Sequence, residues 1–62
     1  MEEKEAQEMM LKVWEDKPVP ESKLREAIDI MYGESVPAMS LVRYYRKQGE
    51  TELQIAQMMK LY

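Results

Sequence analysis

Residues 40–62 read SLVRYYRKQGETELQIAQMMKLY, and this stretch contains the best-marked turn of the chain between two helical patterns. Gly49 is expected to end the first helix, because glycine readily takes the left-handed conformation that follows many helices. Thr51 can cap the second helix, because its hydroxyl can accept a hydrogen bond from a free backbone N–H of the first turn. The stretch therefore predicts a helix, a tight turn and another helix.

The residues before this stretch repeat the helical spacing. Apolar side chains recur at intervals of three and four from Ala6 to Trp14, and Pro18 and Pro20 end that helix, because a residue before proline is disfavoured in the α region. A second apolar face ends before Gly33, which we expect in a left-handed conformation. Ser35 is the expected cap of the third helix. We predict an all-α fold, a small bundle of four short helices at about 2–16, 20–32, 36–47 and 51–61, in one domain covering 1–62.

The length of 62 residues makes the core marginal, because so short a chain buries only about 60% of its unfolded surface. Small domains compensate with disulfides, a metal, good helix packing or association. The chain has neither Cys nor His, which excludes disulfides and the usual zinc ligands. We therefore expect a homo-oligomer, most simply a dimer.

The formal net charge of −3 is unevenly distributed, with an acidic front and a mildly basic last third. An acidic total disfavours non-specific nucleic-acid binding, which depends on cationic contacts with phosphates. No apolar run approaches the roughly twenty residues of a membrane-spanning helix, and residues 1–16 lack a signal-peptide pattern. We expect a cytoplasmic protein that does not contact membranes.

The residue types needed for catalysis are scarce. His, the commonest general base, and Cys, a common nucleophile, are both absent. Gly33 and Gly49 stand alone, so no glycine-rich phosphate loop is present. We expect a protein that is not an enzyme and that uses no cofactor and no metal.

The candidate charged contact patch is formed by Arg43, Tyr44, Arg46 and Lys47 at the end of the third helix. These side chains are expected to point largely away from the core, with Tyr45 inside it. Basic residues interleaved with aromatic ones can contact an acidic protein, because Tyr and Arg are enriched in interface hot spots, or can hold a nucleic acid. The third interpretation is an ordinary solvated helix end.

The candidate apolar interface comes from the methionine-rich helices. Its members are Met9, Met10, Val13, Trp14, Met58 and Met59. Methionine is common at adaptable binding surfaces, but it also fills gaps in small cores, so both interpretations stay open. The two adjacent Met pairs favour the interface. We expect a small non-enzymatic protein–protein interaction module, a self-associating regulator or adaptor.

Residues 41–62 resemble the first half of a helix-turn-helix DNA-binding motif. Ile55, Ala56, Met59 and Leu61 match its apolar and Ala positions, while Lys60 replaces the turn glycine. The recognition helix would begin at Tyr62, where the sequence ends. The resemblance implies an alternative function as a DNA-binding transcriptional regulator, or a fragment of one. In a second alignment the fourth helix is itself the recognition helix, with Gln54 and Gln57 facing bases.

Overall fold

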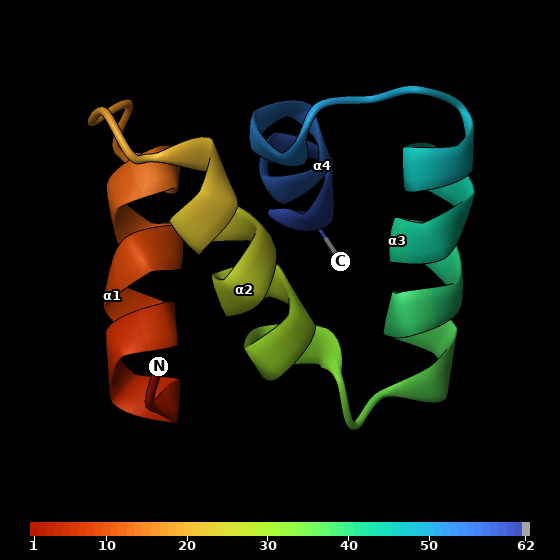
Figure 1. Cartoon of the computed structure of the whole chain (residues 1–62), viewed down its shortest axis with the longest axis horizontal. Coiled ribbons are helices and arrows are strands. Elements are labelled where there is room, and N and C mark those ends of the chain that lie inside the picture. Colours follow the sequence, from red (N-terminus) through yellow and green to blue (C-terminus); the bar gives the residue numbers. More distant parts are fainter. Residues whose placement is uncertain (62) are drawn as a thin grey trace.

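The turn at Gly49 joins the last two of four helices in the computed structural model, which describes residues 1–61 (Figure 1). The helices are α1 (Glu3–Trp14), α2 (Glu21–Tyr32), α3 (Val36–Lys47) and α4 (Glu52–Met59). Residues 1–61 contain no strand, so the predicted all-α bundle of four short helices is confirmed. Tyr62, where a recognition helix would begin, lies outside the described residues.

The third helix has the predicted bounds, whereas α1 and α4 each end two residues earlier than expected. α1 stops because Asp16 takes a left-handed conformation with φ of 60°. The N–H groups of Asp16 and Lys17 then donate back to the carbonyl oxygens of Val13 and Lys12, at 3.0 and 2.8 Å. This pair of bonds closes a helix end by satisfying carbonyls that would otherwise lack partners.

Two predicted caps are confirmed, and one prediction about a glycine is wrong. The Ser35 hydroxyl accepts from the Ala38 N–H at the start of α3, and Thr51 forms a reciprocal capping box with Gln54 at the start of α4. Gly33, however, is right-handed, with φ of −60°. Glycine is needed there for space, because an added Cβ would overlap the Asp29 carbonyl oxygen.

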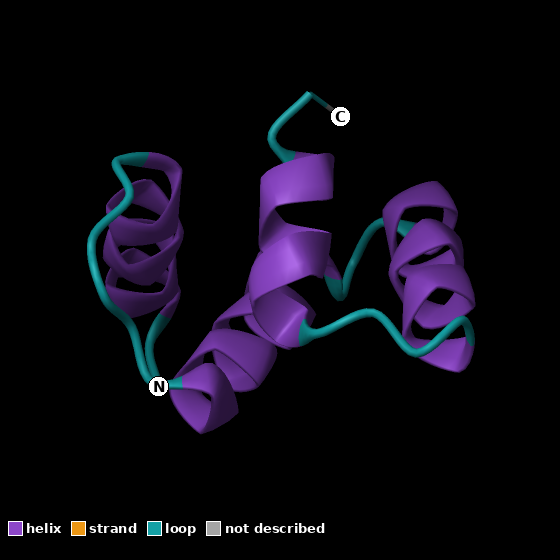
Figure 2. Cartoon of the chain, turned by 90° about the horizontal axis from the view of Figure 1, so that it is seen from above, coloured by secondary structure: helices purple, strands orange, loops and turns teal. Residues whose placement is uncertain are grey.

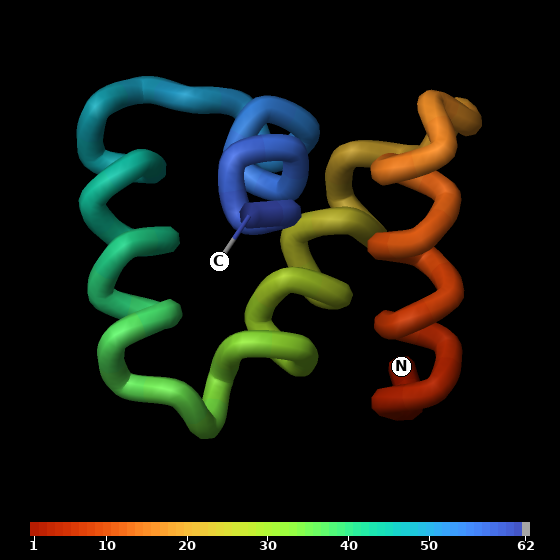
Figure 3. The backbone as a smooth tube through the Cα atoms, turned by 180° about the vertical axis from the view of Figure 1, so that it is seen from behind, coloured from red at the N-terminus to blue at the C-terminus, as the bar shows by residue number. Residues whose placement is uncertain are grey.

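The helices form an arrangement in which α1 and α3 lie on opposite sides and do not touch. α2 and α4 lie between them, and each packs against both outer helices (Figures 1 and 2). The view from behind shows α4 filling the space between α3 and α1 (Figure 3). No helix of the described chain is long and apolar enough to cross a membrane.

The core receives apolar side chains from all four helices. Its fully buried members are Ala6, Met10, Val13, Leu24, Ala27, Ile28, Ala38, Val42, Ile55, Ala56 and Met59. None of them is aromatic, and half-buried side chains such as Trp14 and Tyr45 pack around them. The helices therefore meet through alanine, methionine and branched aliphatic side chains, which permits close packing in so short a chain.

Two hydrogen bonds join the C-terminal turn of α1 to α4. The Trp14 indole Nε1 donates to the Ala56 carbonyl oxygen at 2.9 Å, and the Gln57 amide Nε2 donates to the Val13 carbonyl oxygen at 2.9 Å. Both carbonyls lie in the last turn of their helix, where few backbone acceptors have a helical partner, and the Val13 carbonyl also accepts from the Asp16 N–H. Each helix thus supplies a side chain that satisfies the end of the other.

We predict that Trp14→Ala destabilises the fold by roughly 3–5 kcal/mol, because it removes a large packed ring and the donor to Ala56. Trp14→Phe keeps a ring and should cost less, with about 1–3 kcal/mol from the unsatisfied carbonyl. Urea unfolding followed by far-UV circular dichroism measures both. Equal stability of the wild type and Trp14→Ala would show that the indole contributes nothing to the fold.

Candidate interaction surfaces

The structure separates the predicted charged patch into two parts. Arg46 turns inward, and its guanidinium Nη2 lies 2.7 Å from Oε1 of Glu52. Its Nε lies 3.2 Å from each Glu52 carboxylate oxygen, and its Nη1 lies 2.9 Å from Oδ1 of Asp29. The expectation that Arg46 points away from the protein is therefore wrong, because two carboxylates on neighbouring helices pull it inward.

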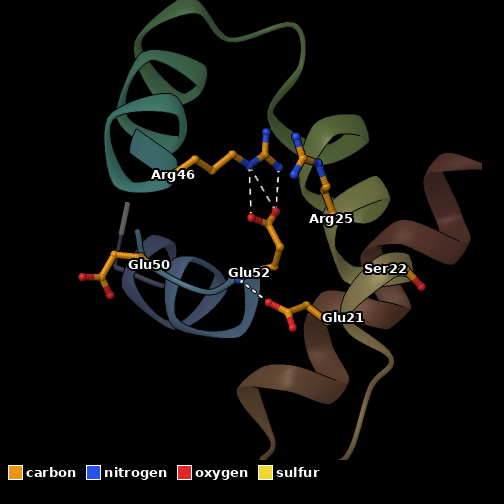
Figure 4. Close-up of a pocket in the computed structure, with 6 residues that line it drawn as sticks. All are labelled: Glu21, Ser22, Arg25, Arg46, Glu50 and Glu52. Carbon is orange, nitrogen blue, oxygen red and sulfur yellow. Dashed lines mark hydrogen bonds and ion pairs between the residues drawn. The ribbon is translucent and has the colours of Figure 1, made fainter. Parts of the chain in front are cut away.

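This Arg46 cluster joins three helices, since Asp29 belongs to α2, Arg46 to α3 and Glu52 to α4. Figure 4 shows its Arg46–Glu52 pair. Glu52 is only 7% exposed and is the one buried charged residue of the described chain. Its backbone N–H also donates to Oε1 of Glu21 at 3.1 Å. A buried carboxylate is costly unless it is paired and hydrogen-bonded, and Arg46 provides both.

Hydrogen bonding to Glu52 raises the pKa of Arg46, against the opposing effect of burial, and Asp29 adds to the increase. A raised pKa on a base means that the stabilising charge is lost only as the pH rises past that value. Arg46 therefore stays charged throughout the ordinary pH range.

A hollow of about 410 Å³ lies beside this cluster. It is lined by Glu21, Ser22, Arg25, Arg46, Glu50 and Glu52. Figure 4 shows Glu50 and Ser22 directed away from the Arg46–Glu52 pair, so the lining groups do not converge on one point. No group of three or more potential metal ligands gathers in residues 1–61. Among the lining residues, Arg46 and Glu52 form an ion pair that belongs to the fold itself.

The other members of the predicted charged patch remain on the surface. Arg43, Tyr44 and Lys47 are exposed on the outer side of α3, and neither cation forms an ion pair within residues 1–61. The Tyr44 ring is 57% exposed and meets Tyr45 edge-on, with centroids 5.8 Å apart. The outer side of α3 thus offers two cations beside one aromatic ring.

The predicted apolar interface is mostly internal. Met10, Val13 and Met59 are at most 2% exposed and belong to the core, so they are not available for an interface of the folded chain. Met9 and Trp14 are half-buried against that core. Methionine suits this role because its flexible, unbranched side chain fits irregular gaps in a small core, and the chain has no phenylalanine. Of the predicted set, Met58 is the clearly exposed member.

Two leucines that were not predicted as site residues lie near Met58. Leu53 is 48% exposed, Met58 38% and Leu61 94%. We call Leu53, Gln54, Gln57, Met58 and Leu61 the α4 outer face. The sequence carried a signal for it, because the apolar residues of 51–61 surround more than one side of the helix, which is typical of a helix docked on two sides.

The glutamines of the helix-turn-helix alignment already have partners within the chain. Gln54 Oε1 accepts from the Thr51 N–H at 2.8 Å, and Gln57 holds the Val13 carbonyl. The capping bond occupies the Oε1 of Gln54 that would accept from a base, whereas Gln57 keeps one N–H and its Oε1.

No protein-family model, curated protein or solved structure matches this chain. The four-helix fold and its surfaces are therefore the basis on which a function can be argued.

We predict that Arg46→Met destabilises the fold by about 3 kcal/mol, because it leaves Glu52 buried without a counter-charge. The matched change Arg43→Met on the same helix should stay within about 0.5 kcal/mol, since Arg43 is exposed and unpaired. Chemical denaturation of both variants gives the comparison.

The double variant Arg46→Met/Glu52→Met supplies the control for this prediction. It removes both charges, so it should be more stable than Arg46→Met alone. If the double variant is less stable than the single one, Glu52 stabilises the fold by some route other than pairing with Arg46.

Proposed function

We propose that this protein is a non-enzymatic protein–protein interaction module that self-associates through the α4 outer face. The supporting observation is the lack of charge on that face. Six residues between positions 53 and 61 are exposed, and five of them are uncharged, with Lys60 the exception. The exposed residues of α1, α2 and α3 include charged side chains on every helix, in a chain that is 34% charged.

An uncharged face suits association of two identical chains. In a two-fold dimer the same patch occurs on both partners, so like charges near the axis would face each other. Leucine, methionine and glutamine avoid that repulsion and supply apolar area with hydrogen-bonding amides. Exposed apolar side chains grouped on one face are a common mark of an interaction site.

Light scattering after size exclusion should give a mass near twice the 7.4 kDa monomer at about 100 µM. Leu53→Glu should shift the protein to monomer, because each new carboxylate would be buried against apolar side chains of the other copy. The fold should survive, since an acid in the first helical turn suits the helix dipole.

The matched control is Val36→Glu, which also converts an exposed apolar residue in a first helical turn but lies on α3. This variant should remain dimeric. A wild type that stays monomeric at about 1 mM would overturn the proposed self-association. Equal loss of dimer in both variants would show that the dimer interface does not lie on α4.

The outer side of α3 supports a second candidate function, binding to an acidic protein or to duplex DNA. The observation that favours it is the pair of cations Arg43 and Lys47, which form no ion pair within residues 1–61 and lie beside exposed Tyr44. Both cations lie on one helix face four residues apart, where like charges repel slightly. An anionic partner would remove that repulsion.

Reversing both cations, Arg43→Glu and Lys47→Glu, should abolish such binding and keep the helix content, because Glu is a good helix former. The matched control, Lys12→Glu with Lys23→Glu, changes the total charge equally at exposed positions elsewhere. Fluorescence anisotropy with a labelled DNA duplex, repeated at several salt concentrations, measures the effect.

Binding to DNA should weaken log-linearly with salt, with a slope of about −0.9 per phosphate neutralised. If both reversed variants bind the duplex equally, the α3 cations do not form its site. If neither variant nor the wild type binds, the DNA alternative is excluded. Association through the α4 outer face should survive the α3 reversal and depend only weakly on salt.

A further inference from the structure

A second hollow, of about 290 Å³, lies at one end of the α4 outer face. It is lined by Val13, Asp16, Lys17, Pro18, Leu53 and Gln57. The end of α1, the following loop and residues 53–57 of α4 therefore meet around it. Leu53 and Gln57 belong both to the hollow and to the α4 outer face, so the two features are continuous.

A side chain projects from the other end of the same line. Leu53, Gln57 and Leu61 are spaced four residues apart, which places them along one side of a helix. Lys60, which follows α4, keeps right-handed backbone angles with φ of −55° and ψ of −33°. The line therefore continues to Leu61, which is 94% exposed. α4 carries a hollow beside its start and a projecting leucine past its end.

We propose, resting on the self-association proposed above, that Leu61 of a second copy occupies this hollow. The two α4 helices then lie antiparallel about a two-fold axis at Gln57. That axis brings Leu61 of each chain opposite Leu53 of the other, because both lie four residues, or about 6 Å, from Gln57. Each copy gives one leucine and receives one, as a two-fold interface requires.

The amide at the axis has the hydrogen-bonding capacity for this arrangement. Gln57 Nε2 uses one N–H on the Val13 carbonyl oxygen. An amide has two N–H donors and a carbonyl acceptor, so the second N–H and Oε1 remain for the other copy. Two glutamines related by the axis can therefore exchange hydrogen bonds without losing their bonds to α1.

A dimer interface of the usual area would also require contact at the hollow. A typical specific interface covers about 800 Å² on each partner, close to a fifth of this chain's 4397 Å². One short helix face offers less than that. An inserted Leu61 would contact the α1–α2 loop at Asp16, Lys17 and Pro18. This contact would enlarge the interface beyond the α4 outer face.

The test uses cysteine pairing, which has no background because the natural chain contains no Cys. Leu53→Cys and Leu61→Cys are prepared separately, one labelled with ¹⁵N, then mixed at about 100 µM in a glutathione redox buffer and weighed by mass spectrometry. The disulfide between positions 53 and 61 should exceed either symmetric disulfide at least tenfold. Two copies of position 61 would lie about 12 Å apart, beyond disulfide reach.

Random pairing would give only about twice as much mixed disulfide as either symmetric disulfide. That ratio would overturn the antiparallel register, and so would a symmetric disulfide that dominates. Val36→Cys mixed with Leu61→Cys is the control and should give the random ratio. As an independent check, Leu61→Glu should raise the dimer Kd at least tenfold, and Leu61→Met by less than about threefold.

The outcomes separate this inference from the proposed function. A dimer by light scattering with random disulfides, or with a Kd unchanged by Leu61→Glu, overturns the insertion of Leu61 but leaves self-association intact. A wild type that stays monomeric at about 1 mM overturns both.

Discussion

The pairing of Arg46 with Glu52 is the interaction on which the rest of the structure depends. One guanidinium connects α2, α3 and α4, and it neutralises the only buried charge of the described residues. In a chain without disulfides, such a connection fixes how α3 sits against its neighbours, because α3 makes no contact with α1. It also removes Arg46 from the surface, so that the outer side of α3 presents two cations.

The junction of α1 and α4 depends on two side chains that donate to backbone carbonyls across it. Trp14 and Gln57 each satisfy an acceptor of the opposite helix. Through these two bonds, the side chains of Trp14 and Gln57 hold α1 and α4 together. The α4 outer face, by contrast, consists of leucine, methionine and glutamine and carries no charge.

Core and surface compete for the apolar residues of so short a chain. The methionines at positions 10 and 59 fill the interior, while Leu53, Met58 and Leu61 stay outside. This distribution is unusual for a protein that acts alone, because leucine normally contributes to its own core. The self-association proposed for α4 would give Leu53, Met58 and Leu61 the apolar environment that their own chain does not supply.

The sequence by itself determined the helices: their apolar spacing, the caps at Ser35 and Thr51 and the stop at Gly49 are local features that depend on a few neighbouring residues. Spacing also identified most of the core. It could not decide where Arg46 points, because its partners Asp29 and Glu52 become neighbours only when three helices pack. It could not separate Met10 and Met59 from Met58 either. An apolar stripe looks the same whether its own chain or another covers it, and only the tertiary arrangement of the helices decides which.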